Sequence, residues 1–460
     1  MSSQRQLFGT DGIRGVAGEF PLTLESTYLI GRALGHDLLR TNPRPRVVIG
    51  QDTRESSRWI ADRVSAGLAS LGVEVHSAGV ITTPGIAYLA RSRKFDAGVV
   101  ISASHNPWTD NGIKVFSGDG FKLPDAHELA IEQEIFALLQ SPTSSVPPDS
   151  SVPSSVPGDH ALRSAYVTWL ASTVTTDLSQ LRVVVDCANG AATAEAPELF
   201  RACRLQPRFI HSAPDGKNIN EGCGALHPGT VAKCIADGRF DLGITFDGDA
   251  DRALFSDASG RVINGDAVLL VTARDMHARG VLAGATLVAT TMSNMGLEIE
   301  LPDSGIRMLG IRMLRANVGD KYVLEEMMKT GATLGGEQSG HIIFRDGDAT
   351  TGDGLLTALR LMDIMARSGH SLAELVADLK VFPQRIQNVR VREKVPLDQV
   401  PAVKSAIQGA QRELDGNGRV VVRYSGTEAL ARVMVEAESE AKMNEFTDAI
   451  AGAIRDALGL

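Results

Sequence analysis

The stretch DLGITFDGDADR (Asp241–Arg252) decides much of the fold, because an apolar run ends abruptly in alternating carboxylates. A second stretch, GVVISASHNP (Gly98–Pro107), has the same design but ends in hydroxyl groups and a proline. Apolar runs without alternation are typical of strands that are covered on both faces of a parallel sheet. Ligands bind at the carboxyl ends of such strands in open α/β sheets. The two stretches therefore predict an α/β fold with a site where two strands end.

The carboxylates Asp247, Asp249 and Asp251 alternate with the small residues Gly248 and Ala250. Three like charges this close repel one another unless a cation offsets them. Carboxylate oxygens suit Mg²⁺, and small spacers let the backbone bend around an ion. The spacing does not match an EF-hand loop, which needs Gly at its sixth position and Glu at its twelfth. We predict one Mg²⁺ at this loop, with a solvated acidic loop as the alternative.

The serine-rich end of the second stretch offers Ser102 and Ser104 as nucleophiles, with His105 adjacent. A hydroxyl delivered to a strand end can accept a transferred group covalently. The alternative is a polar turn capped by serine and asparagine. The residues alone leave both readings open, and they do not choose between the two serines.

Four further segments carry weaker signals. Glu337 and Ser339 in GGEQSGH could bind sugar hydroxyls, or the segment could be a glycine-rich hairpin. The segment RYSGTE offers a forked cation, hydroxyls and close N–H groups, which is a phosphate cradle in composition. Its candidate residues are Arg423, Ser425, Gly426 and Thr427, with Arg432 nearby, and its alternative is a hairpin turn. GTDGIRG and DNGIKVFS present Arg14 and Lys114, each of which could also be an exposed base on an ordinary turn.

Composition bounds the class of protein. The 460 residues are 43% apolar and 22% charged, which predicts several folded cores and excludes wholesale disorder. The formal charge of −9 gives no general attraction to nucleic acid. The start of the chain has no apolar signal core and no stretch approaches a membrane span, so we expect a cytoplasmic protein without a membrane partner. The four cysteines show no paired spacing, and we expect buried or inert thiols.

Apolar runs alternate with amphipathic stretches along the chain, as in βαβ units. The residues at 58–71 have helical spacing. Predicted strands are Val47–Gly50, Val73–His76, Gly98–Ser102, Val183–Asp186, Leu242–Phe246 and Leu287–Thr290. The repetitive segment Ser141–Gly158, with SSVP three times, predicts an extended linker. Further boundaries near Ser256–Gly260 and Val381–Arg385 divide the chain into 1–158, 159–257, 258–380 and 381–460.

In this order, these motifs resemble those of the α-D-phosphohexomutase family. SASHNP, DGDADR, GEQSGH and R-x-SGTE carry the resemblance, together with GTDGIRG, QDTR (Gln51–Arg54), TTMSNMGLE (Thr290–Glu298) and VGDKYV (Val318–Val323). The resemblance spans nearly the whole chain. It implies three related α/β domains with mixed, mostly parallel sheets and a smaller α+β C-terminal domain around a central cleft, each domain contributing one loop.

The resemblance also implies a reaction and its residues. Ser104, the serine directly before His-Asn-Pro, would carry a phosphoryl group and would hold Mg²⁺ with Asp247, Asp249 and Asp251. Arg14, Lys114, Arg252 and His341 match positions that line the reaction centre, and His105 adjoins the serine. Glu337 and Ser339 would bind sugar hydroxyls, and Arg423, Ser425, Gly426 and Thr427 would hold the phosphate that is not transferred. A sugar 1,6-bisphosphate would be intermediate and activator, and a homodimer is implied.

GEQSGH, where other family members carry GEMSGH, favours an amino-sugar phosphate. We therefore expect interconversion of glucosamine 6-phosphate and glucosamine 1-phosphate, a step that feeds cell-wall precursors. A glucose or mannose phosphate mutase is the nearest alternative. An aspartate-nucleophile phosphatase, which would react at Asp247, is the second, and a non-catalytic sugar-phosphate-binding regulator is the third.

Overall fold

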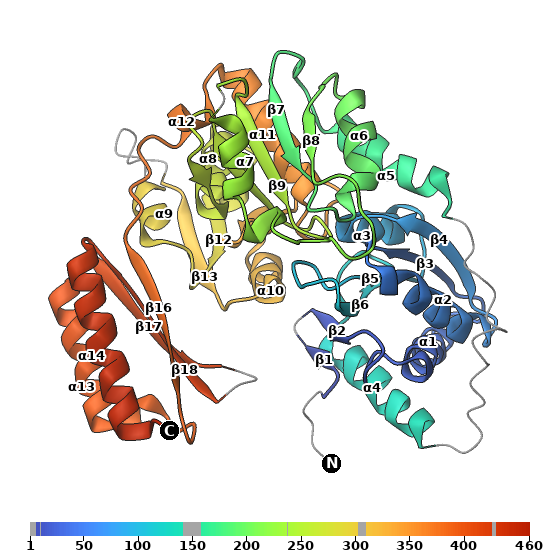
Figure 1. The fold of residues 1–460 in the computed structure, drawn as a ribbon, viewed down its shortest axis with the longest axis horizontal. Coiled ribbons are helices and arrows are strands. Elements are labelled where there is room, and N and C mark those ends of the chain that lie inside the picture. The colour runs from blue at the N-terminus through green and yellow to red at the C-terminus, as the bar shows by residue number, and fades with distance from the viewer. Residues whose placement is uncertain (1–5, 10, 141–157, 237, 302–309, 426–428) are drawn as a thin grey trace. The chain divides into compact units, whose positions relative to one another are not determined.

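The structure is a computed structural model and describes residues 6–9, 11–140, 158–236, 238–301, 310–425 and 429–460 (Figure 1). Residues 141–157 of the repetitive segment and the first copy of a GIRML duplication, at 305–309, lie outside these residues. The chain divides into a first unit, Met1–Thr290 with Ala316–Ala377, and a second unit, Thr291–Arg315 with Asp378–Leu460. None of the described helices is both long enough and apolar enough to cross a membrane.

The first sheet has the strand order β1-β2-β6-β5-β3-β4. Its strands are β1 (Phe8–Gly9), β2 (Gly12–Val16), β3 (Arg46–Gln51), β4 (Glu74–Val80), β5 (Ala97–Ile101) and β6 (Asp110–Ser117). Its helices are α1 (Leu24–Leu39), α2 (Glu55–Ala69), α3 (Thr83–Ser92) and α4 (Asp125–Leu139). β3 pairs in parallel with β4 and β5, whereas β6 is antiparallel to β5 and β2.

Both faces of this sheet are buried, as the apolar runs predict. Val47 and Ile49 of β3 join a core that includes Ile60 and Val64 of α2. Val48, between them, belongs to a separate core that includes residues of α3. Because successive side chains of a strand point to opposite faces, a continuous apolar run is what a doubly covered strand requires.

The second sheet has the order β11-β10-β9-β7-β8. Its strands are β7 (Val183–Asp186), β8 (Arg208–Ile210), β9 (Leu242–Phe246), β10 (Ala253–Asp257) and β11 (Val262–Ile263). The helical segments in this part of the chain are α5 (His160–Ser172), α6 (Ala192–Ala202), η2 (Gly224–Leu226) and α7 (Gly229–Ile235). β7 is parallel to β8 and β9, and β10 returns antiparallel to β9.

The third sheet contains β12 (Thr286–Thr290), which is parallel to β14 (Leu334–Gly336), and β15 (Ile342–Phe344), which is antiparallel to β14. β13 (Arg312–Ala316) runs across the boundary between the two units. The helical segments are α8 (Gly265–Ala278), η3 (Ala283–Ala285), α10 (Asp320–Thr330), α11 (Gly354–Ser368) and α12 (Leu372–Leu375). Asp353 caps α11, because its carboxylate accepts the N–H of Leu356.

The second unit has a small antiparallel sheet in the order β16-β18-β17. Its elements are α9 (Met295–Glu300), β16 (Gln384–Arg390), η4 (Leu397–Gln399), α13 (Pro401–Leu414), β17 (Gly418–Tyr424), β18 (Leu430–Ala437) and α14 (Glu440–Leu458). Figure 1 shows α13 and α14 side by side against this sheet, and their apolar residues share one core with β18. The predicted α/β class, with three α/β domains and a smaller C-terminal domain, is confirmed.

Candidate active site

The turn after β5 presents Ser104. Its backbone is left-handed, with φ 52°, and its N–H donates to Ser102 Oγ at 3.0 Å. The Arg54 guanidinium, buried in the core, donates to the main-chain oxygens of Ser104 (3.0 Å) and Asn106 (2.7 Å), and the amide of Asn220 donates to the same two oxygens. Ser102 therefore shapes the turn, and Ser104 is the residue whose hydroxyl reaches the acidic loop.

The loop after β9 places its carboxylates opposite that turn. Asp247, Asp249 and Asp251 are buried, and one oxygen of each lies within 4.8 Å of the others. Ser104 Oγ donates to Asp247 Oδ2 at 2.5 Å. The two loops also touch through their backbones, since a Cβ on Gly248 would lie 2.5 Å from the Ser104 oxygen. The structure thus brings together the serine and the acidic trio that the sequence predicts.

The electrostatics of the trio are uneven. Burial, together with the like charges of Asp251 and Asp249, raises the pKa of Asp247 well above its usual range. Burial also acts to raise the pKa of Asp251, but Lys114, His341 and Arg252 outweigh it and hold that pKa well below normal. Cations therefore offset the negative charge of Asp251. At Asp247, beside Ser104, burial and like charge outweigh the cation Arg252.

The trio fits a divalent cation. Asp249 Oδ1 and Asp251 Oδ1 are buried and have no hydrogen-bond partner among the described residues. A buried carboxylate oxygen without a partner is costly, and a cation would remove that cost. The donors are all carboxylate oxygens, which is the ligand type that Mg²⁺ prefers. This confirms that the trio could hold a metal ion.

Lys114 lies on β6 and is 2% exposed, so it is not an exposed base on a turn. Its Nζ lies 2.8 Å from Asp249 Oδ2, 2.9 Å from Asp11 Oδ2 and 3.7 Å from Asp251 Oδ2. Burial opposes its charge, but these three carboxylates raise its pKa far above the ordinary value. Lys114 is therefore a cation beside the trio at neutral pH.

Asp11 is a site residue that sequence reasoning missed, although it stands in the GTDGIRG motif. The Arg14 guanidinium donates to the same carboxylate that Lys114 contacts. Burial opposes ionisation, but Lys114, Lys122 and Arg14 hold the pKa of Asp11 well below its usual range. One carboxylate thus orients two of the predicted cations.

Thr83 is the second missed residue. Its Oγ1 donates to Asp249 Oδ2 at 2.5 Å, and its N–H donates to the Asp249 main-chain oxygen at 3.0 Å. Thr83 is the first residue of α3. The start of a helix in the domain of the first sheet therefore fixes the Asp249 carboxylate, which belongs to the domain of the second sheet. No motif in the sequence signals this contact.

Arg252 and His105 meet beside the serine. Arg252 Nη1 donates to His105 Nδ1 at 3.3 Å. His105 Nδ1 also lies 3.4 Å from Ser104 Oγ. Burial and the cations Arg252 and Arg14 lower the pKa of His105. The imidazole is therefore neutral at neutral pH, with Nδ1 as its acceptor.

The GEQSGH segment forms the hairpin between β14 and β15. The Glu337 N–H donates to the His341 main-chain oxygen at 2.9 Å, and Glu337 Oε1 accepts the Gly319 N–H at 3.1 Å. Gly340 has φ 92°, and a Cβ there would lie 2.3 Å from the Ala253 oxygen, so only glycine lets this hairpin contact the strand after the acidic loop. Glu337 and Ser339 are partly exposed.

His341 is buried at the base of this hairpin. Its Nε2 accepts the Gly352 N–H at 3.1 Å, which leaves the proton of the neutral ring on Nδ1, 3.6 Å from Asp251 Oδ2. Burial lowers the pKa of His341, but the carboxylates of Asp251, Asp320 and Glu337 outweigh burial and leave it raised. His341 can therefore take up a proton close to the trio.

The predicted phosphate cradle lies on the sheet of the second unit. Arg423 of β17 is directly opposite Arg432 of β18, which is directly opposite Asn388 of β16. The three side chains line a cavity of about 370 Å³. Ser425 is buried where the β17–β18 hairpin begins, and its main-chain oxygen accepts from Lys394 at 2.7 Å. Gly426 and Thr427 lie outside the described residues.

A second cluster of possible metal ligands is Asp186, His211 and Cys223. Each Asp186 oxygen already accepts a backbone N–H, from Ala188 and from Gly224. Burial and the Asp186 charge raise the pKa of Cys223 to about 12, which opposes the thiolate that a metal needs. We interpret this cluster as support for the loop that carries Asn220.

Models of known protein families and the sequences of known relatives match nearly the whole chain. Four models of phosphoglucomutase/phosphomannomutase domains match: α/β/α domain I at residues 5–141, domain II at 164–260, domain III at 264–382 and the C-terminal domain at 387–453. Relatives named phosphoglucosamine mutase include one from Koribacter versatilis, 61% identical over 99% of this chain and 98% of the relative. Another, from Solibacter usitatus, is 51% identical over 99% of each.

Solved structures share the fold. A phosphoglucomutase/phosphomannomutase family protein from Burkholderia thailandensis has a TM-score of 0.78 at 24% identity, covering 99% of each chain. The N-acetylphosphoglucosamine mutase of Aspergillus fumigatus, solved in complex with GlcNAc-6P and magnesium, has a TM-score of 0.65 at 19% identity, covering 99% of this chain and 96% of its own.

The fold and the site define a class of multidomain α/β proteins in which a buried serine faces a buried acidic trio. Within that class, the chain belongs to the phosphoglucomutase/phosphomannomutase family, the α-D-phosphohexomutases. The resemblance drawn from the motifs is thereby confirmed.

Proposed function

We propose that this chain is an isomerase that interconverts glucosamine 6-phosphate and glucosamine 1-phosphate through a phosphoserine enzyme and a bisphosphate intermediate. The observation that carries the proposal is the 2.5 Å contact between Ser104 Oγ and the buried Asp247 carboxylate, in a chain 61% identical to a relative named phosphoglucosamine mutase. The product serves the synthesis of amino-sugar nucleotides and cell-wall precursors.

Two phosphoryl transfers complete the proposed reaction. In the first, a free sugar hydroxyl attacks phosphoserine 104, so the sugar O–P bond forms while the serine O–P bond breaks, giving the bisphosphate. The bisphosphate then turns over, and Ser104 attacks its other phosphoryl group, which restores phosphoserine and releases the isomer. Each transfer moves one proton from the attacking hydroxyl, and one proton reaches the departing oxygen.

The side chains around Ser104 supply charge for a loose transition state. Lys114, Arg14 and Arg252 are the cations, and Asp11 holds the first two in place. The acidic trio and Ser104 would hold one Mg²⁺ per chain, which would neutralise charge on the transferring phosphoryl oxygens. We assign Lys114 as a cation rather than as the base, because the carboxylates around it raise its pKa.

His341 is the residue we assign to the proton. Its ring is buried, its pKa is raised by three carboxylates against the effect of burial, and a proton gained at Nε2 would displace the Gly352 hydrogen bond. His105 is held as an acceptor by Arg252 and keeps the guanidinium beside the serine.

Recognition of the sugar is proposed for other loops. Glu337 and Ser339 bind sugar hydroxyls, and the second unit holds the phosphate that is not transferred through Arg423, Arg432 and the segment Ser425, Gly426 and Thr427. Each loop belongs to one domain of the division 1–158, 159–257, 258–380 and 381–460. We further propose a cytoplasmic homodimer whose partners are small phosphosugars.

The test is an assay of the purified chain with Mg²⁺ and a trace of sugar 1,6-bisphosphate. Glucosamine, glucose and mannose 6-phosphates are compared, and the 1-phosphates are followed by phosphorus NMR. The highest kcat/KM with glucosamine 6-phosphate supports the proposal, and a higher value with a hexose phosphate favours a phosphoglucomutase or phosphomannomutase. Release of inorganic phosphate indicates a phosphatase, and binding without turnover indicates a regulator.

A further inference from the structure

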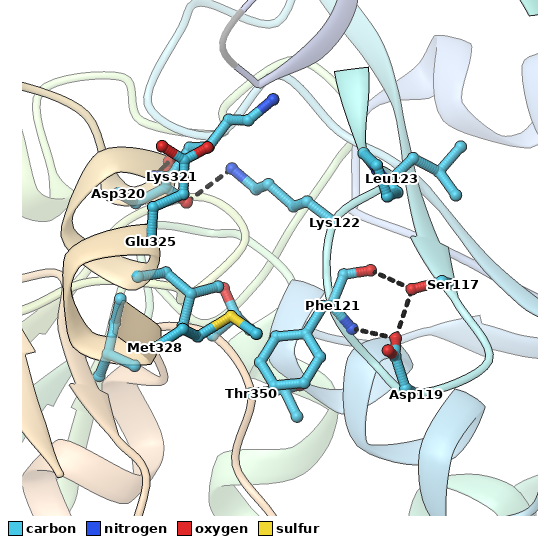
Figure 2. Close-up of a pocket in the computed structure, with 14 residues that line it drawn as sticks. Ser117, Asp119, Phe121, Lys122, Leu123, Asp320, Lys321, Glu325, Met328 and Thr350 are labelled. Carbon is cyan, nitrogen blue, oxygen red and sulfur yellow. Dashed lines mark hydrogen bonds and ion pairs between the residues drawn. The ribbon is translucent and has the colours of Figure 1, made fainter. Parts of the chain in front are cut away.

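A cavity of about 250 Å³ lies in the first unit between the turn after β6 and helix α10 (Figure 2). Its lining is largely apolar and includes Phe121 and Met328. Lys122 and Asp320 also line it, joined by an ion pair that Figure 2 marks. This ion pair links the domain of the first sheet to that of the third, and neither residue touches the acidic trio in the contacts described above.

Lys122 makes two strong contacts. Its Nζ lies 2.6 Å from Asp320 Oδ2 and 2.7 Å from Asp11 Oδ1, and its side chain is only 16% exposed. Burial opposes its charge, but the two carboxylates raise its pKa above the ordinary value. Lys122 is therefore a fixed cation between two carboxylates from different domains.

Both carboxylates continue to groups of the reaction centre. The other oxygen of Asp11 lies 2.9 Å from Lys114 Nζ, and Asp320 Oδ2 lies 3.6 Å from His341 Nε2. Lys114 and His341 in turn lie 3.7 and 3.6 Å from the same atom, Asp251 Oδ2. The contacts close into a ring of basic and acidic side chains in strict alternation: Lys114, Asp11, Lys122, Asp320, His341 and Asp251.

We propose that Lys122 and Asp320 are positioning residues of the mutase reaction, which act through Asp11 and His341 to fix Lys114 and the His341 ring at the trio. The inference rests on the proposed function and extends it to residues outside the reaction centre. Without Lys122, the Asp11 carboxylate keeps only Lys114 and Arg14 and is free to draw Lys114 away from Asp249. Without the Asp320 charge, the imidazole loses one of the two carboxylates that flank it.

The chain offers a matched control on the wall of the same cavity. Lys321, the residue after Asp320, pairs with Asp125 of α4 and so also links α10 to the domain of the first sheet. The Asp125 side chain is 61% exposed, and neither residue belongs to the ring. Lys321→Met thus removes an interdomain ion pair of the same sequence region without touching Asp11 or His341.

The experiment measures kcat and KM for glucosamine 6-phosphate, with the thermal unfolding midpoint, in the wild type and in Lys122→Met, Asp320→Asn, Lys122→Arg and Lys321→Met. A displacement of reacting groups by about 1 Å costs about 100-fold in rate. We expect kcat to fall about 10- to 100-fold in Lys122→Met and Asp320→Asn, with KM within about threefold of wild type. Lys122→Arg, which keeps the cation, should recover most of the loss, and Lys321→Met should match wild type.

The outcomes separate the two proposals. A wild type without mutase activity overturns the proposed function, whereas an active wild type with equally active Lys122→Met and Asp320→Asn overturns this inference alone. Equal losses in Lys122→Met and Lys321→Met, or losses that follow the unfolding midpoint, would make the ion pair a structural link only and overturn positioning. If neither Lys122→Met nor Asp320→Asn folds, positioning is also overturned. That result is what an ion pair that only holds the domains together predicts.

Discussion

Ser104 is the residue on which the proposed chemistry depends, because its Oγ is the hydroxyl that meets Asp247. The other serine of the turn, Ser102, uses its Oγ to accept the Ser104 N–H. Ser104→Ala should therefore lower turnover by on the order of 10³-fold or more. It should also abolish the phosphorylated peptide that mass spectrometry detects in the wild type.

Ser102→Ala is the control for that prediction. It removes a hydrogen bond from the turn but leaves the Ser104 hydroxyl, so the chain should still carry phosphate at residue 104 and keep measurable activity. Phosphate found at residue 102 in the Ser104→Ala variant, together with turnover, would move the nucleophile to Ser102.

At the scale of residues, the sequence predicts site residues that stand together in one short run. It misses site residues that only folding brings to the site. Ser104 and the carboxylates 247–251 stand in short runs after strands, so their proximity to a sheet edge could be predicted. Asp11, Thr83 and Asp320 come from three places and meet the site only through folding. Two of them stand in recognised motifs, but a motif does not state which of its side chains turns inward.

At the scale of elements, the serine turn and the acidic loop meet through backbone, and glycine makes that possible. A Cβ on Gly248 would lie 2.5 Å from the Ser104 oxygen and 2.9 Å from the Asn220 amide nitrogen. Gly248→Ala must separate the two loops, so we expect a loss of about 1–3 kcal/mol in stability and of about 10- to 100-fold in kcat. Steady-state kinetics and chemical denaturation measure the two effects.

Gly229→Ala is the matched control for Gly248→Ala. Gly229 opens α7 in the same domain, and nothing lies within 4 Å of a Cβ built there. Alanine favours a helix over glycine by about 1 kcal/mol, so this variant should be as stable as wild type or slightly more stable. Equal effects of the two substitutions would mean that the contact between the loops does not govern activity.

Glu195 of α6 gives the fold a pH dependence of its own. Its Oε1 accepts the Thr82 N–H, and burial raises its pKa to about 8 although that N–H and Arg163 act to lower it. Between the ordinary pKa of 4.5 and about 8 the folded chain holds a proton that the unfolded chain has lost. The free energy of unfolding therefore falls as the pH rises through this window, by at most about 1.4 kcal/mol per pH unit, and levels off above it.

Glu195→Gln removes this contribution, because an amide does not titrate. We expect the variant to gain stability relative to wild type as the pH rises from about 5 to about 8, as measured by denaturant unfolding at each pH. Glu198→Gln on the same helix, with a side chain 38% exposed, should show no such gain. A constant difference between Glu195→Gln and wild type across this range would contradict the prediction.

How well the sequence predicts a strand depends on the length of the strand and on its burial. Val183–Asp186 and Leu242–Phe246 are strands with the predicted bounds, because fully buried strands have an unmistakable apolar run. β1 and β11 have two residues each, too few for any periodicity to register. β6 begins as DNG, which favours a turn in isolation, and its pairing with β5 and β2 overrides that preference.

At the scale of the whole molecule, the chemistry and the proposed phosphate cradle belong to different compact units. A phosphate that is not transferred is bound equally in the ground state and the transition state, so its contacts lower KM more than they raise kcat. Arg423→Met should therefore raise KM for glucosamine 6-phosphate about 10- to 100-fold and change kcat little.

Arg419→Met is the comparison for Arg423→Met. Arg419 lies on the same strand but does not line the cradle; it pairs with Glu436 and donates to the main-chain oxygens of Thr291 and Ser293. Arg419→Met should leave KM close to the wild-type value. An equal rise in KM for both variants would mean that general damage to the small sheet, and not the loss of phosphate contacts, is responsible.

The concealment of Ser104 has a consequence for how the molecule is switched on. A protein kinase grips its target as an accessible, extended segment, yet this residue is 1% exposed, has a left-handed backbone and is anchored through its main-chain oxygen by Arg54 and Asn220. On the proposed function, each newly synthesised chain would therefore stay inactive until a small diffusible phosphoryl donor enters the site and phosphorylates Ser104. We therefore expect the supply of that donor, rather than a protein kinase, to set the fraction of active chains.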